Sequence, residues 1–342
     1  MKNISELRQD IVTGDWVVVA TGRARRPHAR NGRPEPPQPR SGCPFERLLP
    51  EALLVFDRTG NRRYPSLKNR RELARSWWLQ IVPNKYPAFQ ASEICPLPNS
   101  AGPYQFLQGV GFHEVVVTRD HTRSLATMTP QEATILMRGY RERYSSLKRE
   151  KCAKYVSIFH NHGHDAGATI SHPHSQIIAI PVIPPGVGRS LAGSAAYYRK
   201  RRRCVHCAMI AFERSDGRRV IYENKNFIVF CPYVSRQAFE IRVFPKRHQP
   251  EFEAMRESEI VPAGEALRIA LAKLERGLRH PAYNFFLHTA PVTGGRSNAH
   301  YHWHIEILPK TAVWAGFEIG TGIQISSTSP EVAGRYLRAI KI

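Results

Sequence analysis

Asn161–Ile180, with the sequence NHGHDAGATISHPHSQIIAI, decides how the rest of this chain is interpreted. Five of the 15 histidines of the chain fall between positions 160 and 174. A polar loop that contains glycine then leads into the apolar run Ile177–Ile180. This run is short, β-branched and closed by Pro181, so it predicts a buried strand.

Two histidines and a glutamine stand where the loop joins this strand. Because side chains alternate along a strand, His172, His174 and Gln176 are expected on one face. Two imidazoles and an amide beside a glycine-containing loop suit a site that handles phosphate. The alternative is a pair of surface histidines beside a core strand.

The composition is that of a globular protein with a large positive charge. The chain has 342 residues, a length sufficient for two domains or one large one. Of these residues, 42% are hydrophobic and 10% aromatic. The net charge of +22 favours anionic partners, whether nucleotides, sugar phosphates or nucleic acid, without choosing among them. No apolar run approaches the ~20 residues needed to span a bilayer, and the first residues lack a signal-peptide core. We therefore expect a cytoplasmic protein with no membrane partner.

The chain contains two similar halves. A strand over Gly111–Thr118 ends near His121 in the first half, and a strand over Phe239–Phe244 ends near His248 in the second. Each half continues with a long helix, a strand ending in histidine, a loop, and a His-x-His followed by an apolar strand. These segments lie at 129–151, 155–160 and 172–180 in the first half and at 257–278, 284–288 and 302–308 in the second. Further strands are expected in an N-terminal hairpin and at 77–82, 220–222 and 227–231.

This repeat predicts an α+β fold made of two tandem units, mostly antiparallel sheet with flanking helices. The units are expected at residues 1–188 and 189–342, and the Pro- and Gly-rich segment Pro181–Gly188 is interpreted as a linker or crossover. Residue by residue, His113–Val117 is aligned with Phe239–Val243.

A C-x-x-C motif precedes the second unit, and histidines follow it at repeated positions. Two thiolates and two imidazoles make a closed tetrahedral set for zinc. The expected ligands of this site are Cys204, Cys207, His248 and His302. A redox pair or two packed thiols are the alternatives for the motif alone.

The first unit offers a matching set in which a carboxylate replaces one thiol. Its expected ligands are Cys43, Glu46, His121 and His172. A carboxylate binds zinc more weakly and with less selectivity than a thiolate, so the alternative is a relic site held together by hydrogen bonds.

The other three cysteines have no partner at a useful spacing. Six cysteines in a cytosolic chain indicate metal binding or burial rather than a disulfide framework. Cys95, Cys152 and Cys231 are therefore expected to be unpaired, in the core or incidental.

His174 is the candidate nucleophile. If His172 is held by a metal or by the scaffold, His174 is the free imidazole and can attack the α-phosphorus of a nucleotide diphosphate. This requires a backbone carbonyl that fixes its tautomer, and donors for the phosphate oxygens. Gln176 can supply an amide donor, and the loop can supply backbone N–H groups. The expected loop donors are Gly167, Ala168 and Thr169.

The residue two positions after His174 is glutamine, where a third histidine could have supplied a proton. The leaving group is therefore expected to need no proton, as a sugar phosphate does not. Water would also be a poor acceptor without a base. Both points favour group transfer over hydrolysis.

The motif His172-Pro173-His174-Ser175-Gln176, with Asn161 upstream, is accompanied by further motifs along nearly the whole chain. They are Thr13-Gly14-Asp15-Trp16, Arg23-Ala24-Arg25-Arg26-Pro27, Cys43-Pro44-Phe45, Pro83-Asn84-Lys85-Tyr86-Pro87, Pro245-Lys246-Arg247-His248 and Gly316-Phe317-Glu318-Ile319-Gly320-Thr321-Gly322. Together they resemble the galactose-1-phosphate uridylyltransferases, the transferase branch of the histidine-triad superfamily. The resemblance implies tandem histidine-triad-like units.

This resemblance implies a ping-pong reaction and a set of substrate contacts. UDP-glucose would uridylylate His174 and release glucose 1-phosphate, and galactose 1-phosphate would then accept the uridylyl group. The implied contacts are Asn161 and Gln176 with the phosphates, Asn84 on the uridine side, Arg23 and Arg26 near the phosphoryl groups, and Glu318 and Gln324 with hexose hydroxyls from the second subunit of a homodimer. The family also binds one or two zinc ions at sets that match those above.

Glu46 departs from the family pattern, in which a second cysteine is usual. A related ADP-sugar phosphorylase keeps the histidine nucleophile and uses an adenylyl group and inorganic phosphate, and the motifs do not separate the two activities. A nucleic-acid-binding protein is the alternative from another class, but no recognition helix, base-stacking aromatic pattern or finger array supports it. A purely structural zinc protein would leave His174 and Gln176 without a role.

Overall fold

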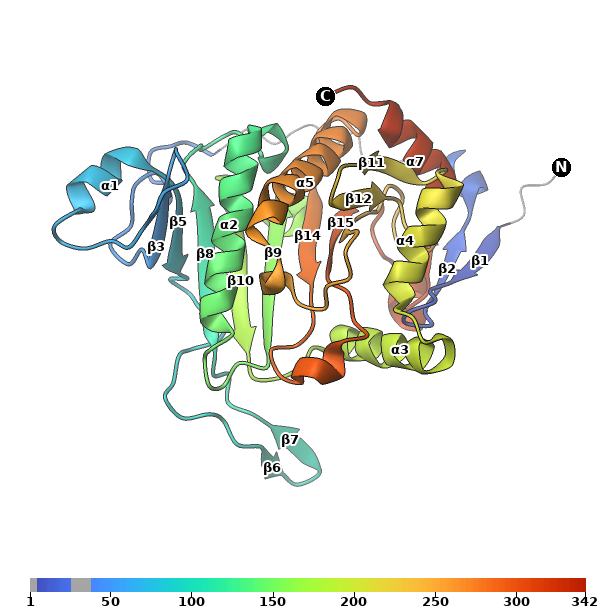
Figure 1. Ribbon diagram of the computed structural model, residues 1–342, viewed down its shortest axis with the longest axis horizontal. Coiled ribbons are helices and arrows are strands. Elements are labelled where there is room, and N and C mark those ends of the chain that lie inside the picture. Colours follow the sequence, from blue (N-terminus) through green and yellow to red (C-terminus); the bar gives the residue numbers. More distant parts are fainter. Residues whose placement is uncertain (1–4, 26–37) are drawn as a thin grey trace.

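The computed structural model describes residues 5–25 and 38–342 (Figure 1). Its centre is one sheet of 11 strands in the order β11-β12-β13-β15-β14-β9-β10-β8-β5-β3-β4. The strands from the first half are β3 (Leu54–Asp57), β4 (Arg62–Arg63), β5 (Trp77–Pro83), β8 (Phe112–Thr118), β9 (Tyr155–His162) and β10 (His174–Ile180). Those from the second half are β11 (Val220–Glu223), β12 (Phe227–Phe230), β13 (Ile241–Pro245), β14 (Tyr283–His288) and β15 (His304–Pro309).

The strand order confirms the repeat. The second half runs β12-β13-β15-β14 toward the centre, and the first half mirrors it as β9-β10-β8-β5. The equivalent strands β9 and β14 pair with each other, with Asn161 opposite Asn284. Every pair in this sheet is antiparallel, so the predicted α+β class is confirmed. The division at residue 188 stays a prediction, and the two halves share one sheet.

The alignment of His113–Val117 with Phe239–Val243 is wrong by one residue. In the structure His174 lies opposite Val117 and Ser175 opposite Val116, whereas Ile305 lies opposite Val243. Because β10 and β15 begin at the equivalent residues His174 and His304, Val116 corresponds to Val243 rather than to Arg242. The sequence alignment failed because short β-branched runs match almost equally well in neighbouring registers.

Helices α2 (Pro130–Leu147) and α5 (Glu257–Gly277) lie side by side across one face of the sheet (Figure 1). Thr129 and Glu132 form a capping box at the start of α2. Close packing of the two helices depends on Gly264, where a Cβ atom would lie 2.8 Å from the backbone carbonyl of Ala133. The main apolar core lies between these helices and the sheet and includes residues from both halves. The strand residues of the other face, including His174 and Gln176, are less buried.

The segment expected to be a linker or crossover is helical in its second half. Helix α3 (Pro185–Arg201) begins inside it, and α4 (Val205–Asp216) follows. Pro185 occupies the first helical position, where its missing N–H costs nothing and its fixed φ favours the helix. The expected helix ending near Lys151 ends earlier, at Leu147.

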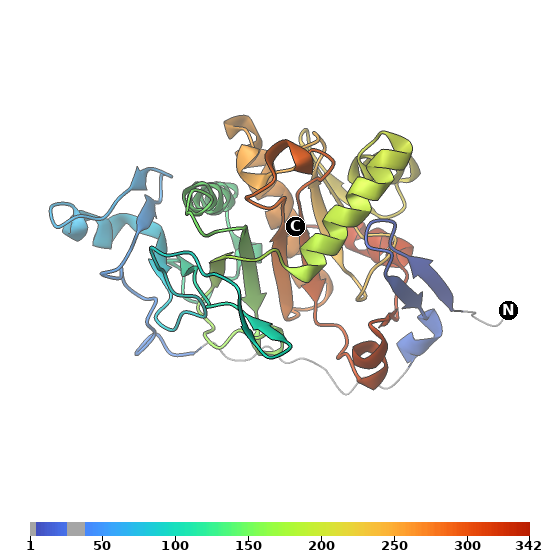
Figure 2. The same cartoon turned by 90° about the horizontal axis from the view of Figure 1, so that it is seen from below.

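The predicted N-terminal hairpin is confirmed as β1 (Glu6–Gln9) and β2 (Trp16–Val19), and β2 also pairs in parallel with β16 (Gln324–Ser326). Figures 1 and 2 show this small sheet at the end of the molecule occupied by the second half, while α1 (Arg70–Ser76) lies at the other end. Helices α6 (Gly316–Thr321) and α7 (Pro330–Ala339) flank β16 in the sequence. Short 3-10 turns lie at Thr21–Arg25, Leu125–Thr127, His164–Ala166, Phe252–Ala254 and Gly295–Asn298. None of the helices within the described residues is long and apolar enough to cross a membrane.

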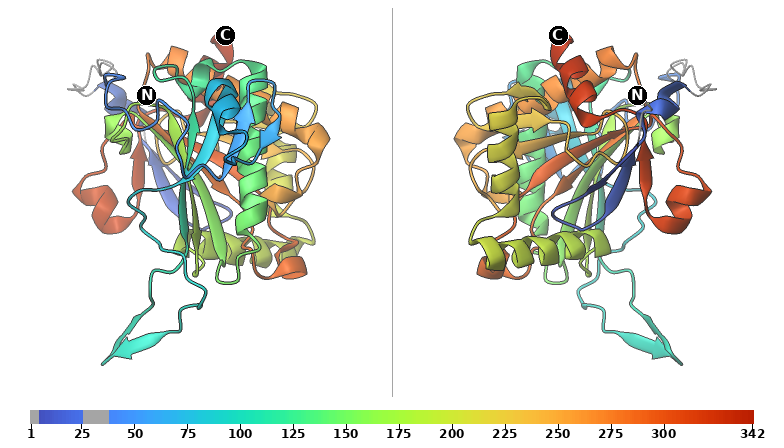
Figure 3. Two further views of the ribbon diagram at one scale, coloured as in Figure 1. Left: turned by 90° about the vertical axis from the view of Figure 1, so that its left-hand side faces the viewer. Right: turned by 90° about the vertical axis from the view of Figure 1, so that its right-hand side faces the viewer.

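Strands β6 (Asn99–Ala101) and β7 (Tyr104–Phe106) form a hairpin arm that projects from the body (Figures 1 and 3). A disulfide joins Cys95, before this arm, to Cys152 in the turn between α2 and β9. The expectation that these two cysteines are unpaired is therefore wrong. They are 57 residues apart in the sequence, and only the return of the arm's loop to the sheet brings their Cα atoms to 5.1 Å. Cys231 is free and buried, as expected.

Candidate active site

His174 is the first residue of β10, on the sheet face opposite α2. Its Nδ1 lies 2.9 Å from the carbonyl oxygen of His172. Since a carbonyl only accepts, Nδ1 carries the hydrogen, and the lone pair of the neutral ring is on Nε2. Burial lowers the pKa of His174, which favours this neutral form at neutral pH. The ring thus has the tautomer that a nucleophilic role requires.

The strand behind His174 is held from the helical side. Ser175 points into the core, with its Oγ 2.5 Å from the Tyr140 hydroxyl of α2 and 3.2 Å from His160 Nδ1 of β9. On the open side, the Phe45 ring lies 5.2 Å from the His174 ring. The contacts from α2 and β9 hold the backbone around His174 in place.

Gln176 lies one strand step beyond His174 on the same face. Its Oε1 is 2.7 Å from Nε2 of His113, a residue of β8. Asn84, which follows β5, has its amide nitrogen 3.0 Å from the same ring nitrogen. Two residues that the resemblance assigns to substrate, Asn84 and Gln176, therefore meet at His113. Our sequence interpretation gave no role to His113, although it lies on the face of its strand that turns toward Gln176.

Asn161, on β9, is oriented by its counterpart in the second half. The Asn284 amide nitrogen donates to Asn161 Oδ1 at 2.8 Å and to the carbonyl oxygen of Ala166 at 2.8 Å. This leaves the Asn161 amide nitrogen toward Gly167, where an added Cβ atom would lie 3.8 Å from it. Gly167 has φ 88°, a conformation that favours glycine.

The loop offers fewer free backbone donors than expected. The N–H of Gly167 donates to the carbonyl of His164 at 2.8 Å, and that of Ala168 donates to the carbonyl of Gly163 at 3.2 Å. Both groups thus have acceptors within the loop, and their expected donation to phosphate stays a prediction. Thr169 is the expected donor whose N–H has no acceptor among the described residues.

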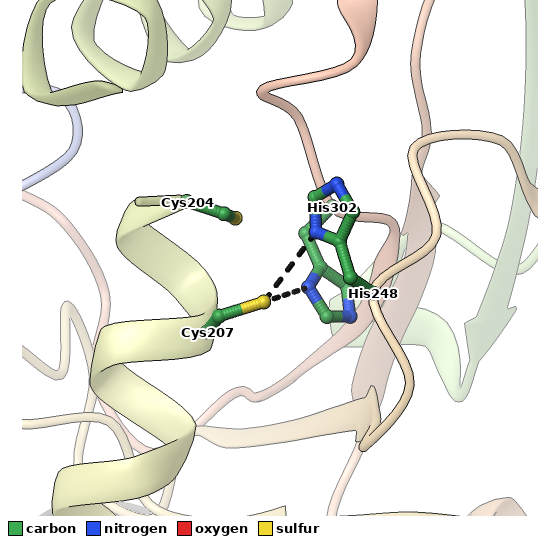
Figure 4. Close-up of side chains that lie close together, drawn as sticks. All are labelled: Cys204, Cys207, His248 and His302. Atoms are coloured by element: carbon green, nitrogen blue, oxygen red, sulfur yellow. Dashed lines mark hydrogen bonds between the residues drawn. The ribbon is translucent and has the colours of Figure 1, made fainter. Parts of the chain in front are cut away.

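Two four-residue sets could hold metal ions, and in each set the ligand atoms lie within 4.8 Å of one another. They are the predicted sets: Cys204, Cys207, His248 and His302, and Cys43, Glu46, His121 and His172. In the first of these, two cysteines at the start of α4 face two histidines from the loops beside β13 and β15 (Figure 4). Cys207 Sγ lies 3.4 Å from His248 Nδ1 and 3.5 Å from His302 Nδ1.

The histidine tautomers fit a cation at this second-unit set. His248 Nε2 lies 2.7 Å from the carbonyl oxygen of Ala299, and His302 Nε2 lies 3.0 Å from that of Pro245. Each Nε2 therefore carries the hydrogen, and each Nδ1 presents a lone pair to the thiols. Backbone carbonyls that orient ligand imidazoles in this way are typical of zinc sites.

The first-unit set follows the same design. Nε2 of His172 lies 2.6 Å from the carbonyl oxygen of Thr118, and that of His121 lies 2.7 Å from that of Gln38. The two Nδ1 atoms then face each other at 3.2 Å with no hydrogen between them. Glu46 Oε1 is buried beside them, close to His121 Nδ1, and has no donor among the described residues. Lone pairs and a carboxylate oxygen that converge without a proton fit a bound cation, and such a ligand set suits zinc.

The second unit has a closed counterpart of His174. His304 Nδ1 lies 3.1 Å from the carbonyl oxygen of His302, which repeats the anchoring of His174. However, His304 Nε2 lies 3.3 Å from Glu306 Oε1, and burial lowers the pKa of His304 to about 4. Glu306 also forms ion pairs with Arg236 and Arg242. The ring that is open in the first unit is therefore enclosed in an ion-pair network in the second.

The remaining predicted contacts lie away from this site or outside the description. Arg23 lies in the 3-10 turn after β2 and is partly exposed. Glu318 bonds to the backbone of Ala315 in α6, and Gln324 bonds to the carbonyl of Gly322. Among the described residues, no hydrogen bond or ion pair joins any of these three to His174. Arg26 lies outside the described residues.

Comparison with known proteins identifies the family of this chain. The family model "Galactose-1-phosphate uridyl transferase, N-terminal domain" matches residues 1–184. This chain belongs to the galactose-1-phosphate uridylyltransferase family. A model for a domain of unknown function also matches residues 104–340.

Named relatives of this family member include two activities. An ADP-glucose phosphorylase of Arabidopsis thaliana is 31% identical, over 98% of this chain and 93% of its own length. A galactose-1-phosphate uridylyltransferase of Thermotoga maritima is 27% identical, over 98% of this chain and 99% of its own length. The relatives are transferases and a phosphorylase, which supports an enzymatic role.

Solved structures agree with the fold. The crystal structure of the Arabidopsis ADP-glucose phosphorylase with bound ADP-glucose has a TM-score of 0.80 at 28% identity and covers 99% of this chain and 100% of its own. A structure described as uridylyltransferase has a TM-score of 0.74 at 28% identity and covers 98% of each chain.

Proposed function

We propose that this protein is a nucleotidyltransferase that exchanges hexose 1-phosphates on a nucleotide sugar, converting UDP-glucose and galactose 1-phosphate into UDP-galactose and glucose 1-phosphate. The observation that carries the proposal is the orientation of His174, whose Nδ1–H is held by the His172 carbonyl while Nε2 has no hydrogen-bond partner among the described residues. In the second unit, His304 is anchored in the same way, but its Nε2 lies beside Glu306 and is closed to a substrate.

In the first half-reaction, His174 Nε2 attacks the α-phosphorus of the nucleotide sugar. The new N–P bond forms as the bond from phosphorus to the bridging oxygen breaks, and the electron pair leaves with the hexose 1-phosphate. The Nδ1–H stays on the His172 carbonyl, which stabilises the positive charge that develops on the ring. The second hexose 1-phosphate reverses these steps.

Amide donors from two strands suit the phosphate oxygens in this reaction. Asn161 and Gln176 each have their oxygen engaged by a protein donor. Their amide nitrogens have no acceptor among the described residues, and we propose that they donate to non-bridging oxygens. Arg23 and Arg26 are proposed near the phosphoryl groups, and Asn84 on the nucleoside side. Fixed donors aimed at developing charge are the usual source of such catalysis.

Zinc is proposed at both metal sets. When bound at Cys43, Glu46, His121 and His172, it would lock the segment whose carbonyl orients His174. We further propose a cytoplasmic homodimer in which Glu318 and Gln324 of a second copy contact the hexose. The two units at residues 1–188 and 189–342 remain part of this proposal.

Intact-mass analysis after exposure to UDP-glucose tests the nucleophile. We expect the wild-type chain to gain one uridylyl group, and His174→Ala to gain none and to lose exchange activity. His304→Gln is the matched control, because it changes the equivalent histidine of the second unit, and it should still be labelled. A fully active His174→Ala protein would refute the assignment.

A second candidate is an ADP-glucose phosphorylase, favoured by the similarity to the Arabidopsis enzyme at 31% sequence identity. It would use the same histidine, carry an adenylyl group and take inorganic phosphate as acceptor. Parallel labelling with UDP-glucose and ADP-glucose distinguishes the two. Preferred labelling by ADP-glucose, with release by phosphate, would replace the first assignment.

A further inference from the structure

His113 links two parts of the candidate site that come from different strands. Its ring contacts Gln176 of β10 on one side and the segment after β5 on the other. We propose that His113 is a positioning residue that sets the orientation of the Gln176 amide toward phosphate. This inference rests on the proposed function, and in it His113 acts through Gln176.

The backbone decides which nitrogen of His113 carries the hydrogen. The N–H of Ala88 donates to His113 Nδ1 at 3.1 Å. A backbone N–H cannot accept, so Nδ1 is bare and the hydrogen of the neutral ring is on Nε2. Nε2 therefore donates to the atom that lies 2.7 Å away, Gln176 Oε1.

This bond determines which end of the Gln176 amide faces the site. An amide side chain can rotate to exchange its oxygen and nitrogen, and an acceptor in place of the nitrogen would repel phosphate. With the oxygen held by His113, the nitrogen turns away from the ring. No acceptor contacts that nitrogen among the described residues, so both of its hydrogens remain for a ligand. Without His113, the amide would be free to present either end.

Backbone groups, and not the His113 ring, order Asn84 on the proposed nucleoside side. The Asn84 N–H donates to the backbone carbonyl of His113 at 2.8 Å, and the Tyr86 N–H donates to Asn84 Oδ1 at 2.9 Å. Because the single hydrogen on His113 Nε2 is donated to Gln176, the Asn84 amide nitrogen completes no bond there. It too remains a donor for a ligand.

The second unit shows the alternative arrangement at the equivalent positions. In the aligned register, Glu306 replaces Gln176 and Glu240 replaces His113. These carboxylates are buried and paired with Arg236 and Arg242. A pair of carboxylates offers no donor to phosphate, which agrees with the closed state of that unit.

A double-mutant cycle tests whether His113 acts through Gln176. The single-turnover rate of His174 nucleotidylation is measured for the wild type, His113→Ala, Gln176→Ala and the double variant, with whichever of UDP-glucose and ADP-glucose labels the wild type. Loss of the amide donor in Gln176→Ala should slow labelling by roughly 10²–10³-fold. We expect His113→Ala to slow it by about tenfold, and the double variant to be within about twofold of Gln176→Ala.

Rate losses that multiply in the double variant would overturn the proposal, since His113 would then act independently of Gln176. His113→Gln keeps an N–H donor within reach of Gln176 and should recover most of the rate. If His113→Ala does not fold, His113→Gln takes its place as the test. A His113→Gln rate as low as that of Gln176→Ala would then contradict the proposal. Equal thermal stability of the variants excludes a loss of folded protein.

The ¹⁵N chemical shifts of the His113 ring test the geometry without any turnover. In the neutral ring, we expect a protonated Nε2 and a bare Nδ1, and a protonated Nδ1 would refute the proposal. If neither nucleotide sugar labels the wild-type chain, the proposed function fails, and this measurement still decides the orientation that His113 imposes.

Discussion

At the scale of single residues, the chemistry depends on which nitrogen of each histidine carries a hydrogen. Backbone carbonyls take the Nδ1–H of His174 and the Nε2–H of the four histidines in the metal sets. These tautomers suit one ring for its proposed role as nucleophile and four for their proposed role as metal ligands. The choice follows from where the strand and loop backbones place their carbonyl groups.

Glu46 is the residue whose change should show most directly that the first set binds zinc. Glu46→Cys replaces a carboxylate with a thiolate and should raise zinc retention against a chelator by about tenfold, because thiolate is the stronger ligand. Metal analysis after dialysis against graded chelator measures this. Glu46→Gln is the control and should lose zinc more readily than the wild type. Equal zinc loss from all three proteins would contradict the prediction.

At the scale of elements, long-range links hold the loops and termini on the sheet. The Cys95–Cys152 disulfide ties the loop of the hairpin arm to the turn between α2 and β9. At the other end of the molecule, Arg8 of β1 and Arg219, just before β11, both bond Glu331 of α7. Each link joins segments that local sequence patterns do not connect.

The disulfide should stabilise the fold. With the cysteines 57 positions apart in the sequence, a double Cys95→Ser/Cys152→Ser variant should lose about 2–4 kcal/mol of unfolding free energy, because its unfolded chain is less restricted. Denaturant unfolding measures this loss. The reduced wild-type protein is the control and should match the variant. An unchanged midpoint in both would show that the disulfide contributes nothing to stability.

Glu331 should make the free energy of unfolding depend on pH in the acidic range. Burial alone would raise the pKa of Glu331, but the hydrogen bonds from Arg8 and Arg219 outweigh it and lower the pKa to about 2 from 4.5. Since the folded-state pKa is lowered, the stabilisation is complete above pH 4.5 and is lost as the pH falls toward 2. Urea unfolding between these limits should show a shallower loss of stability for Glu331→Gln than for the wild type. Parallel pH profiles for the two proteins would contradict the prediction.

At the scale of the whole molecule, the two halves form one sheet and share one core. Strands β9 and β14 pair along the centre, and the main core cluster draws on both halves. The N-terminal hairpin also contacts the second half, because Arg8 bonds Glu331 and the carbonyl of Tyr233. The halves therefore depend on each other for stability even though each repeats the same unit.

A split at residue 188 should show this dependence. A fragment of residues 1–188 would expose the edge of β9 and the apolar face that packs on α5, so we expect it to aggregate or remain unfolded when expressed alone. Co-expression with residues 189–342 should restore a folded complex, seen by size-exclusion chromatography and a cooperative melt. A soluble 1–188 fragment with its own cooperative melt would show that the units are independent.

The sequence alone determined the α+β class, the duplication, the members of both sets that could hold a metal ion and the strand that carries His174. These properties depend on short-range alternation and on side-chain chemistry within a few residues, which short segments encode directly. Only the tertiary structure decided the Cys95–Cys152 pairing, the register between the halves and the contact of His113 with Gln176. Each depends on how segments far apart in the chain meet across the sheet, and neighbouring registers or alternative partners look equally good until the whole core is packed.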